Sequence, residues 1–364
     1  MEGIFFDQYQ TFRCIGPDCP YTCCGGNWRI EIDEETDRFY RRCEGEFGAF
    51  LNQNILRDGG AHFRLDGAGN CAMLDGSGLC RIQTEYGAEH LCQTCRLFPR
   101  LETQRDGMIF FYLSLACPEA ARAALSSPLL LLRRDVPSDA PDTEASLLRR
   151  TALLTAVNLL QDRACDIRQR QRLFLLLSQA VQTALDAGNA DEARAVLAFF
   201  SRPSEYRALA AEDGGTDAAS KVALLRKLGG LFLTERRERR LPELFRAAAE
   251  YLQSPRADFA AFAAALSRQE HENLLPALLP GKYVSAFANG NLYHQAVYVL
   301  TLSQLFRVFA AVDRAARVDA RDAVLAAYID RYFEHTEPEV KARFARLMVE
   351  QGLTDPGFLF RLVS

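Results

Sequence analysis

The chain has 364 residues, more than one average domain, so we expect two domains, one of them able to bury a large core. Its formal net charge of -4, with lysine and arginine dispersed among acidic residues, argues against a general nucleic-acid surface. The sequence lacks a secretion signal at its start and any long uncharged apolar run, so we expect a cytoplasmic protein with no membrane insertion.

Cysteines are concentrated in the first third of the chain. Of the 11 cysteines, only Cys165 lies beyond Cys117. Because the thiols of an unexported protein meet a reducing environment, a dense set of cysteines is expected to bind metal rather than to form disulfides. The stretch from Cys14 to Cys117 therefore predicts a metal site built from cysteines.

Residues 1–125 are also rich in glycine and aromatic residues, and Gly-Gly, Asp-Gly and Cys-Cys pairs interrupt any helical pattern. Short strands and loops are expected to dominate this region. Apolar patterns predict strands over Asn27–Ile32 and Met108–Leu115. Helices are predicted over Glu34–Arg42, after an Asp33 cap, and over Pro118–Leu125.

Residues 126–144 contain SSP and VPSDAPD, which predict a connector that contributes one strand. In residues 145–364, apolar side chains recur at three- and four-residue spacing, which predicts an all-α domain of roughly eight to ten helices without a fixed repeat. Helix breaks are predicted at 186–189, 201–204, 213–216, 279–281, 289–291 and 336–338. The predicted fold class is mainly α: a small irregular α+β, cysteine-rich metal-binding domain over 1–125, followed by this all-α helical domain.

Cysteine spacing indicates what kind of metal the site would hold. The first cluster reads Cys14-x4-Cys19-x3-Cys23-Cys24, the second reads Cys71-x8-Cys80-x11-Cys92-x2-Cys95, and Cys117 closes the region. Thiolates from two segments can complete a four-coordinate centre, whereas calcium and magnesium demand oxygen ligands. Only one CxxC pair is present and the thiols outnumber the ligands of one zinc ion, so a 4Fe-4S iron–sulfur cluster is favoured, with zinc as the alternative.

Several residues near these clusters could act at the metal site or have only a structural role. Cys43 and Cys165 lie on helical patterns and are predicted to pack as small apolar residues. Arg96 or Arg100 would offset thiolate charge or bind a substrate carboxylate, unless they form ordinary salt bridges. His90, two residues before Cys92, is expected to stay outside the metal site.

The segments FRCIGPDCPYTCCGGNWRIEID, CAMLDGSGLCRIQTEYGAEHLCQTCRLFPR and SLACPEAAR resemble the flagellin lysine N-methylase family, part of a wider group with a zinc- or iron-chelating CxxCxxCC-type domain. The resemblance is strong over about the first third of the chain. In the C-terminal helices it is loose, and rests on the apolar stretch Tyr293–Ala310 and the YFEH element that ends at His335.

The resemblance implies a set of metal-associated cysteines: Cys14, Cys19, Cys23, Cys24, Cys71, Cys80, Cys95 and Cys117. Cys92 corresponds to a variable position. Met73 stands where relatives commonly have proline or phenylalanine, and the four-residue spacing after Cys14 differs from the two-residue spacing of the wider group. The resemblance also implies methyl transfer to lysine side chains of flagellin, with S-adenosylmethionine as the donor.

The methyl-donor site and the catalytic residues are not identified by the sequence. No G-x-G-x-x-G loop follows a strand, no CxxxCxxC loop of radical enzymes is present, and the helical remainder offers no βα barrel. One hypothesis is a donor pocket between the cysteine-rich and helical regions, with these candidate walls: Trp28, Phe98, Phe110, Phe111 and Tyr112. Core packing is the alternative for each of these aromatic residues.

Two functions therefore stay open. The favoured one is an S-adenosylmethionine-dependent protein-lysine N-methyltransferase that acts on flagellin and carries an iron–sulfur cluster, by direct displacement rather than a radical route. The alternative is a non-catalytic, cysteine-rich zinc or iron–sulfur protein that serves as a protein-interaction module.

Overall fold

The computed structural model describes residues 2–19, 22–25, 28–105, 108–126, 128–136, 143–210, 246–247, 250, 269–285, 291–316, 322–335, 346 and 349–350. Its strands are β1 (Glu2–Phe6), β2 (Ile55–Leu56), β3 (His62–Phe63), β4 (Arg100–Arg105), β5 (Met108–Leu113) and β6 (Leu131–Asp135). Its α-helices are α1 (Gln8–Thr11), α2 (Glu34–Arg41), α3 (Gly45–Gln53), α4 (Arg81–Tyr86), α5 (Gln93–Leu97), α6 (Pro118–Ser126), α7 (Glu144–Leu160), α8 (Ile167–Asp186), α9 (Ala190–Phe200), α10 (Pro203–Leu209), α14 (Gln269–Lys282), α16 (Leu292–Ala316) and α17 (Asp322–His335).

Four strands form a mixed sheet in the order β4-β5-β1-β6. β1 runs parallel to β5, with Ile4 opposite Phe110, and antiparallel to β6, while β4 and β5 pair as an antiparallel hairpin. Side chains alternate between the faces, because successive residues of a strand point in opposite directions. Ile4 and Phe110 enter the large core, whereas Phe111 packs on the other face beneath the Arg134 guanidinium, 4.3 Å from its ring centroid.

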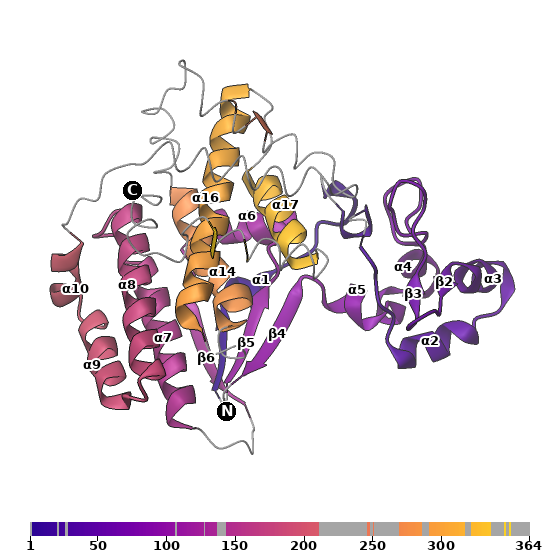
Figure 1. The fold of residues 1–364 in the computed structure, drawn as a ribbon. Helices are drawn as coiled ribbons and strands as arrows, with labels where there is room; N and C mark the ends of the chain where they lie inside the picture. The colour runs from indigo at the N-terminus through magenta and orange to yellow at the C-terminus, as the bar shows by residue number, and fades with distance from the viewer. Residues whose placement is uncertain are drawn as a thin grey trace.

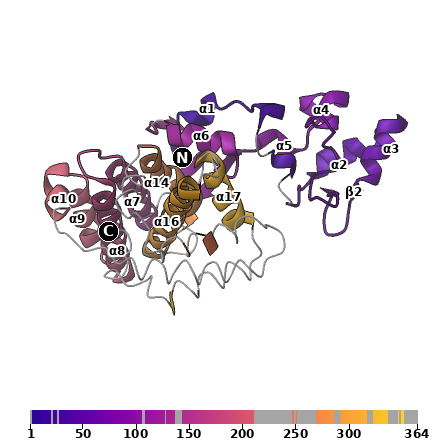
Figure 2. The ribbon, with the colours of Figure 1, turned by 90° about the horizontal axis from the view of Figure 1, so that it is seen from above.

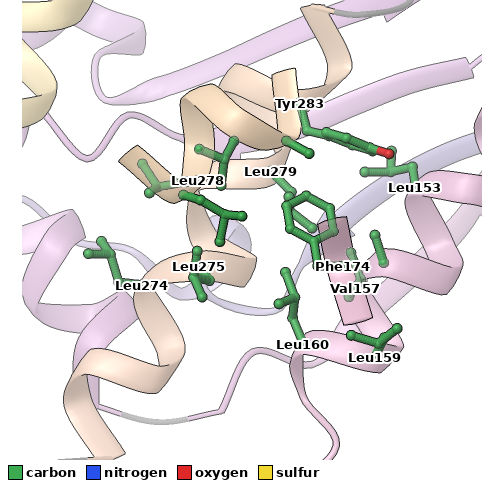
Figure 3. Close-up of a cluster of buried hydrophobic side chains, with 14 of the residues drawn as sticks. Leu153, Val157, Leu159, Leu160, Phe174, Leu274, Leu275, Leu278, Leu279 and Tyr283 are labelled. Carbon is green, nitrogen blue, oxygen red and sulfur yellow. The ribbon is translucent and has the colours of Figure 1, made fainter. Parts of the chain in front are cut away.

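The largest core joins this sheet to the helices. Side chains from β1 and β5 belong to the same buried cluster as those of α7, α8, α14 and α16. Figure 3 shows part of it, where Leu275 and Leu279 of α14 approach Phe174 of α8 and Val157 of α7. The N-terminal strand is therefore built into the helical body of the molecule.

A second, smaller core lies in the cysteine-rich lobe, which comprises residues 22–25 and 28–98 and holds α2 to α5 with the hairpin β2–β3. Figures 1 and 2 show this lobe extending away from the sheet and the helices, with α5 nearest to them. Its buried apolar residues include Tyr40, Leu51 and Phe63, and thiols pack among them. So small a core buries little apolar surface, which is the situation in which small domains depend on metal or disulfides.

Most predicted elements of the first 136 residues are confirmed. Asp33 caps α2 by accepting a hydrogen bond from Thr36 N at 3.0 Å, β5 and α6 lie where apolar patterns placed them, and the connector contributes β6. The predicted strand over Asn27–Ile32 is wrong: among its described residues only Glu31 forms a bridge, to His62. Its partner β3 is two residues long, too short to extend the pairing.

Helix α3 was not predicted, because Gly45 and Gly48 weaken the helical signal. Gly48 has a packing reason: a Cβ atom there would lie 2.3 Å from the carbonyl oxygen of Cys43. Close approach of the two backbone segments requires glycine at this position.

The expectation of a mainly helical C-terminal region is confirmed in the described residues, and with it the fold class. The helix ends near residues 186, 200 and 291 agree with the predicted breaks, whereas those at 213–216 and 336–338 lie outside the described residues. The break at 279–281 is wrong, because α14 continues to Lys282 through Pro276 and Pro280. Burial of its four leucines in the large core outweighs the two lost backbone donors.

The predicted domain bounds of 1–125, 126–144 and 145–364 stay a prediction. Among the described helices, none is both long and apolar enough to cross a membrane.

Candidate metal centre

Two consecutive loops of nearly the same sequence present Cys71 and Cys80. Residues 65–71 read LDGAGNC and residues 74–80 read LDGSGLC. Each loop is closed by a β-bridge between its leucine and its cysteine. In the first, Asp66 Oδ1 accepts from Ala68 N at 2.8 Å and Asn70 N at 2.9 Å.

The second loop repeats these contacts. Asp75 Oδ1 accepts from Ser77 N at 2.8 Å and Leu79 N at 2.9 Å. Gly69 and Gly78 occupy the same left-handed position, with φ of 85° and 83°. Aspartate and glycine are the residues that such turns select, so this internal repeat was a readable signal of two equivalent cysteine-presenting loops.

Other segments bring further cysteines to these loops. Cys71 N donates to Cys24 O at 2.7 Å, which fixes the segment carrying Cys23 and Cys24 beside the first loop. Cys92 and Cys95 lie at the start of α5, where Asp33 Oδ2 accepts from Gln93 N at 2.7 Å. The cap of α2 thus also positions α5.

Six thiols are close enough to influence one another's ionisation: Cys23, Cys24, Cys71, Cys80, Cys92 and Cys95. We call these the six-thiol group. Within it, the side chains of Cys23 and Cys24 hydrogen-bond, as do those of Cys92 and Cys95. Three separate chain segments contribute to the group, as a shared inorganic centre would require.

The hydrogen-bonded pairs polarise the thiols. The hydrogen bond from Cys24 lowers the pKa of Cys23 to about 7, and raises that of Cys24. In the same way, the hydrogen bond between Cys92 and Cys95 lowers the pKa of Cys92 and raises that of Cys95. One thiolate is therefore favoured in each pair, stabilised by its protonated neighbour.

Burial acts on the remaining members of the group. It raises the pKa of Cys71 to about 12 and also raises that of Cys80. A thiolate at either position is costly without a partner of opposite charge. A metal ion is such a partner, because it deprotonates the thiols that it coordinates.

The other three predicted cysteines are placed differently. Cys117 follows the turn after β5 and interacts with Cys19 and Cys23, and burial raises its pKa to about 11. Cys14 is exposed, and its sulfur accepts a hydrogen bond from Gly16 N at 3.4 Å. Electrostatic interactions thus connect seven of the eight predicted cysteines, and Cys14 is exposed, as is Cys23 of the six-thiol group.

The donor set of the six-thiol group suits zinc or an iron–sulfur cluster, since soft thiolates select these metals. In the described part of the chain, no three His, Cys, Asp or Glu side chains stand arranged to hold a metal ion. The thiols are instead hydrogen-bonded in pairs. Ligation would require rotation of side chains, whereas the backbone segments are already together.

Cys92 belongs to the second cysteine cluster of the sequence but not to the set of cysteines that the family resemblance implies. It is fully buried, and its sulfur lies 3.6 Å from Glu31 O. Cys43 and Cys165 pack against the small and the large core, as predicted. His90 stacks on Phe39, with ring centroids 4.6 Å apart.

Arg100 contributes to the local fold near the N-terminus. Its guanidinium donates to Tyr9 O at 3.2 Å and Phe12 O at 2.9 Å, and so fastens the N-terminal segment to β4.

The aromatic residues considered as walls of a donor pocket do not share one environment. Phe110 is in the large core, Trp28 meets Phe98 edge-on at 5.2 Å, and Tyr112 lines a cavity of about 20 Å³. That volume holds about one water molecule. The donor pocket stays a prediction.

Comparison with known proteins finds relatives of this chain in Salmonella. Over 124 residues, which are 32% of this chain, it is 35% identical to the flagellar biosynthetic protein FliU of Salmonella muenchen and covers 73% of that protein. Over a stretch of the same length it is 35% identical to the lysine-N-methylases of Salmonella typhimurium strain LT2 and Salmonella choleraesuis strain SC-B67, and spans 31% of each. No protein-family model and no solved structure matches the chain.

Proposed function

We propose that this chain, which belongs to the family of the flagellar biosynthetic protein FliU and the lysine-N-methylases, is a protein-lysine N-methyltransferase that acts on flagellin. The observation that carries the proposal is the 35% identity over 124 residues to the two lysine-N-methylases, and the equal identity over 73% of FliU shows the family. Because the chain spans only 31% of the two lysine-N-methylases, their activity is carried over as a proposal.

The proposed chemistry is a direct displacement. The lone pair of a deprotonated lysine Nζ attacks the methyl carbon of S-adenosylmethionine, a bond from nitrogen to carbon forms, and the bond from sulfur to carbon breaks. S-adenosylhomocysteine leaves with the electron pair, and the methylated ammonium loses a proton. A deprotonated amine is nucleophilic enough for this step, so no oxidant or reductant is needed.

We further propose that the six-thiol group supplies the ligands of a metal centre, a 4Fe-4S cluster in first preference and zinc as the alternative. When bound, such a centre cross-links the chain segments that carry the thiols and contributes folding energy to the small lobe. Cys71 and Cys80 are the first candidates, because their two matching loops present them alike. Cys24 and Cys95 are next, since each interacts with other thiols of the group.

Methyl transfer is tested by incubating anaerobically purified protein with flagellin and S-adenosylmethionine labelled in its methyl group. Label on flagellin lysines is expected with the wild-type chain and not with Cys24→Ser. Cys43→Ser is the matched control, because Cys43 lies in the same lobe, outside the six-thiol group, with its thiol 3.5 Å from Phe39 O. No label from wild-type protein that carries its metal would refute the methyltransferase.

Metal content separates the two candidate centres. Iron and acid-labile sulfide in stoichiometric amount, with visible absorption that dithionite bleaches, would support the cluster. A colourless protein with stoichiometric zinc would overturn that preference. A metal-bearing protein that transfers no methyl group would instead be the non-catalytic interaction module.

A further inference from the structure

Helix α17 reaches the thiol region from the far end of the chain. Two consecutive side chains of this helix, Asp330 and Arg331, are each 4% exposed. Both contact the turn that follows β5 and leads into Cys117. Residues more than 200 positions apart therefore meet beside a predicted ligand.

Arg331 makes two kinds of contact in this region. Its Nε donates to Ala116 O at 2.7 Å, one residue before Cys117. Its guanidinium lies 4.7 Å from the ring centroid of Trp28, a cation–π geometry.

Trp28 completes the connection to the thiols. Its Nε1 donates to Cys23 O at 2.8 Å, so the indole is fixed to the Cys23 segment while its face receives Arg331. The guanidinium thus holds the Cys117 turn with one N–H and the Cys23 segment through the indole. A planar guanidinium can do both at once, since its donors lie in the plane while its face stacks on the ring.

Asp330 fixes the same turn from a second point. Lys282 Nζ lies 3.1 Å from Asp330 Oδ1, and Ser114 Oγ donates to Asp330 Oδ2 at 3.5 Å. Ser114 Oγ in turn accepts from Ala116 N at 3.3 Å. This buried ion pair links the end of α14 and α17 to residues 114–116, so the position of Arg331 is set by its surroundings.

We propose that Arg331 is a positioning residue of the thiol site: from α17 it holds the Cys117 turn against the Cys23–Trp28 segment. This inference rests on one part of the proposed function, namely that the six-thiol group holds a metal. Outer residues of this kind typically change metal affinity by roughly 10- to 100-fold when they are replaced. It makes the C-terminal helices part of a site whose ligands all lie in the first third of the chain.

The test uses the full-length, metal-loaded chain with Arg331→Met and Arg331→Lys. One readout is metal affinity by chelator competition, and the other is the fluorescence of Trp28, which is the single tryptophan of the chain. The matched control is Arg307→Met, because Arg307 of α16 is equally buried, at 4% exposure, and its guanidinium bonds Gln304. The far-ultraviolet circular dichroism of each variant checks that the helices are retained.

The methionine variant is expected to bind the metal roughly 10- to 100-fold more weakly and to change the Trp28 emission, with helical content unchanged. The lysine variant, which keeps a cation for the Trp28 ring, is expected to recover part of the affinity. Arg307→Met is expected to leave both readouts at their wild-type values. Wild-type affinity and wild-type Trp28 emission in Arg331→Met would overturn the proposal.

A second variant tests the same contact without changing α17. Trp28→Leu removes the ring from the other side of the contact and leaves the helix intact, and it is expected to weaken metal binding as well. Unchanged metal affinity in Trp28→Leu would also count against this inference. Neither readout involves flagellin, so failure of this inference and failure of the methyltransferase proposal are distinguishable.

Discussion

The ion pair between Asp162 and Arg207 gives a stability prediction that can be worked out from the structure. Asp162 lies after the end of α7, and its carboxylate accepts from Arg207 Nη2 at 2.7 Å, Arg207 Nε at 2.8 Å and Tyr206 Oη at 2.7 Å. These bonds fasten α10 to the turn between α7 and α8. The side chain of Asp162 is 11% exposed, so solvent screens the interaction only in part.

The hydrogen bonds from Arg207 lower the pKa of Asp162 from 3.8 to about 2. At neutral pH a depression of this size corresponds to about 2.4 kcal/mol of stability. Because the side chain of Arg207 is 44% exposed, we expect a smaller contribution, about 1 to 2 kcal/mol. The Asp162→Asn variant should be less stable by that amount at pH 7.

The sign of the pH dependence follows from the direction of the pKa change. The folded pKa lies below the unfolded value, so the stabilisation is complete above pH 3.8 and is lost as the pH falls through about 2. By pH 3, about half of the difference between wild type and Asp162→Asn should have disappeared.

The assay is urea unfolding followed by circular dichroism at pH 7 and pH 3. Asp191→Asn is the control, because Asp191 pairs with Arg194 at the surface, with a side chain that is 95% exposed, and should change stability by less than about 0.5 kcal/mol. Equal stability of Asp162→Asn and wild type at pH 7 would refute the reasoning. So would a difference that does not shrink at pH 3.

Three further predictions concern the two cores and the loops. Gly48→Ala should lower the unfolding free energy by about 2 kcal/mol or more in urea unfolding, because the added Cβ would lie 2.3 Å from the carbonyl oxygen of Cys43. Gly67→Ala is the control and should leave the unfolding free energy nearly unchanged, since the space around Gly67 is open. Lys282→Met should cost about 3–5 kcal/mol in thermal or urea unfolding, because it leaves the Asp330 carboxylate buried without its ammonium partner. Asp75→Ala removes the acceptor that shapes its loop and should reduce metal per chain in elemental analysis; a fully loaded variant would show that the loop does not depend on this carboxylate.

Local features of the sequence predicted local features of the structure. Asp33 before an amphipathic stretch predicted the start of α2, the apolar run from Met108 predicted β5, and three- and four-residue spacing predicted the C-terminal helices. These signals succeed because backbone capping and the period of side-chain burial depend on neighbours within a few residues. The resemblance to the flagellin methylase family, stated on the cysteine motifs, is confirmed by the match to FliU.

Cysteine spacing alone identified a region and not a site. It included Cys92, which is fully buried within the six-thiol group, whereas the family resemblance treated this position as variable. The repeated loops around Cys71 and Cys80 were present in the sequence as a signal, whereas the pairing of Cys71 N with Cys24 O depends on segments 47 positions apart.

The sequence by itself determined the elements α2, β5 and α6, the predominance of helix in the C-terminal region, the enrichment of thiols in the first third and the family. Only the tertiary structure decided that β1 lies between β5 and β6, that α14 continues through Pro276 and Pro280, and that Arg331 stands beside Trp28. The physical reason is that these outcomes depend on long-range burial and on contacts between distant segments, whose energies no local pattern encodes.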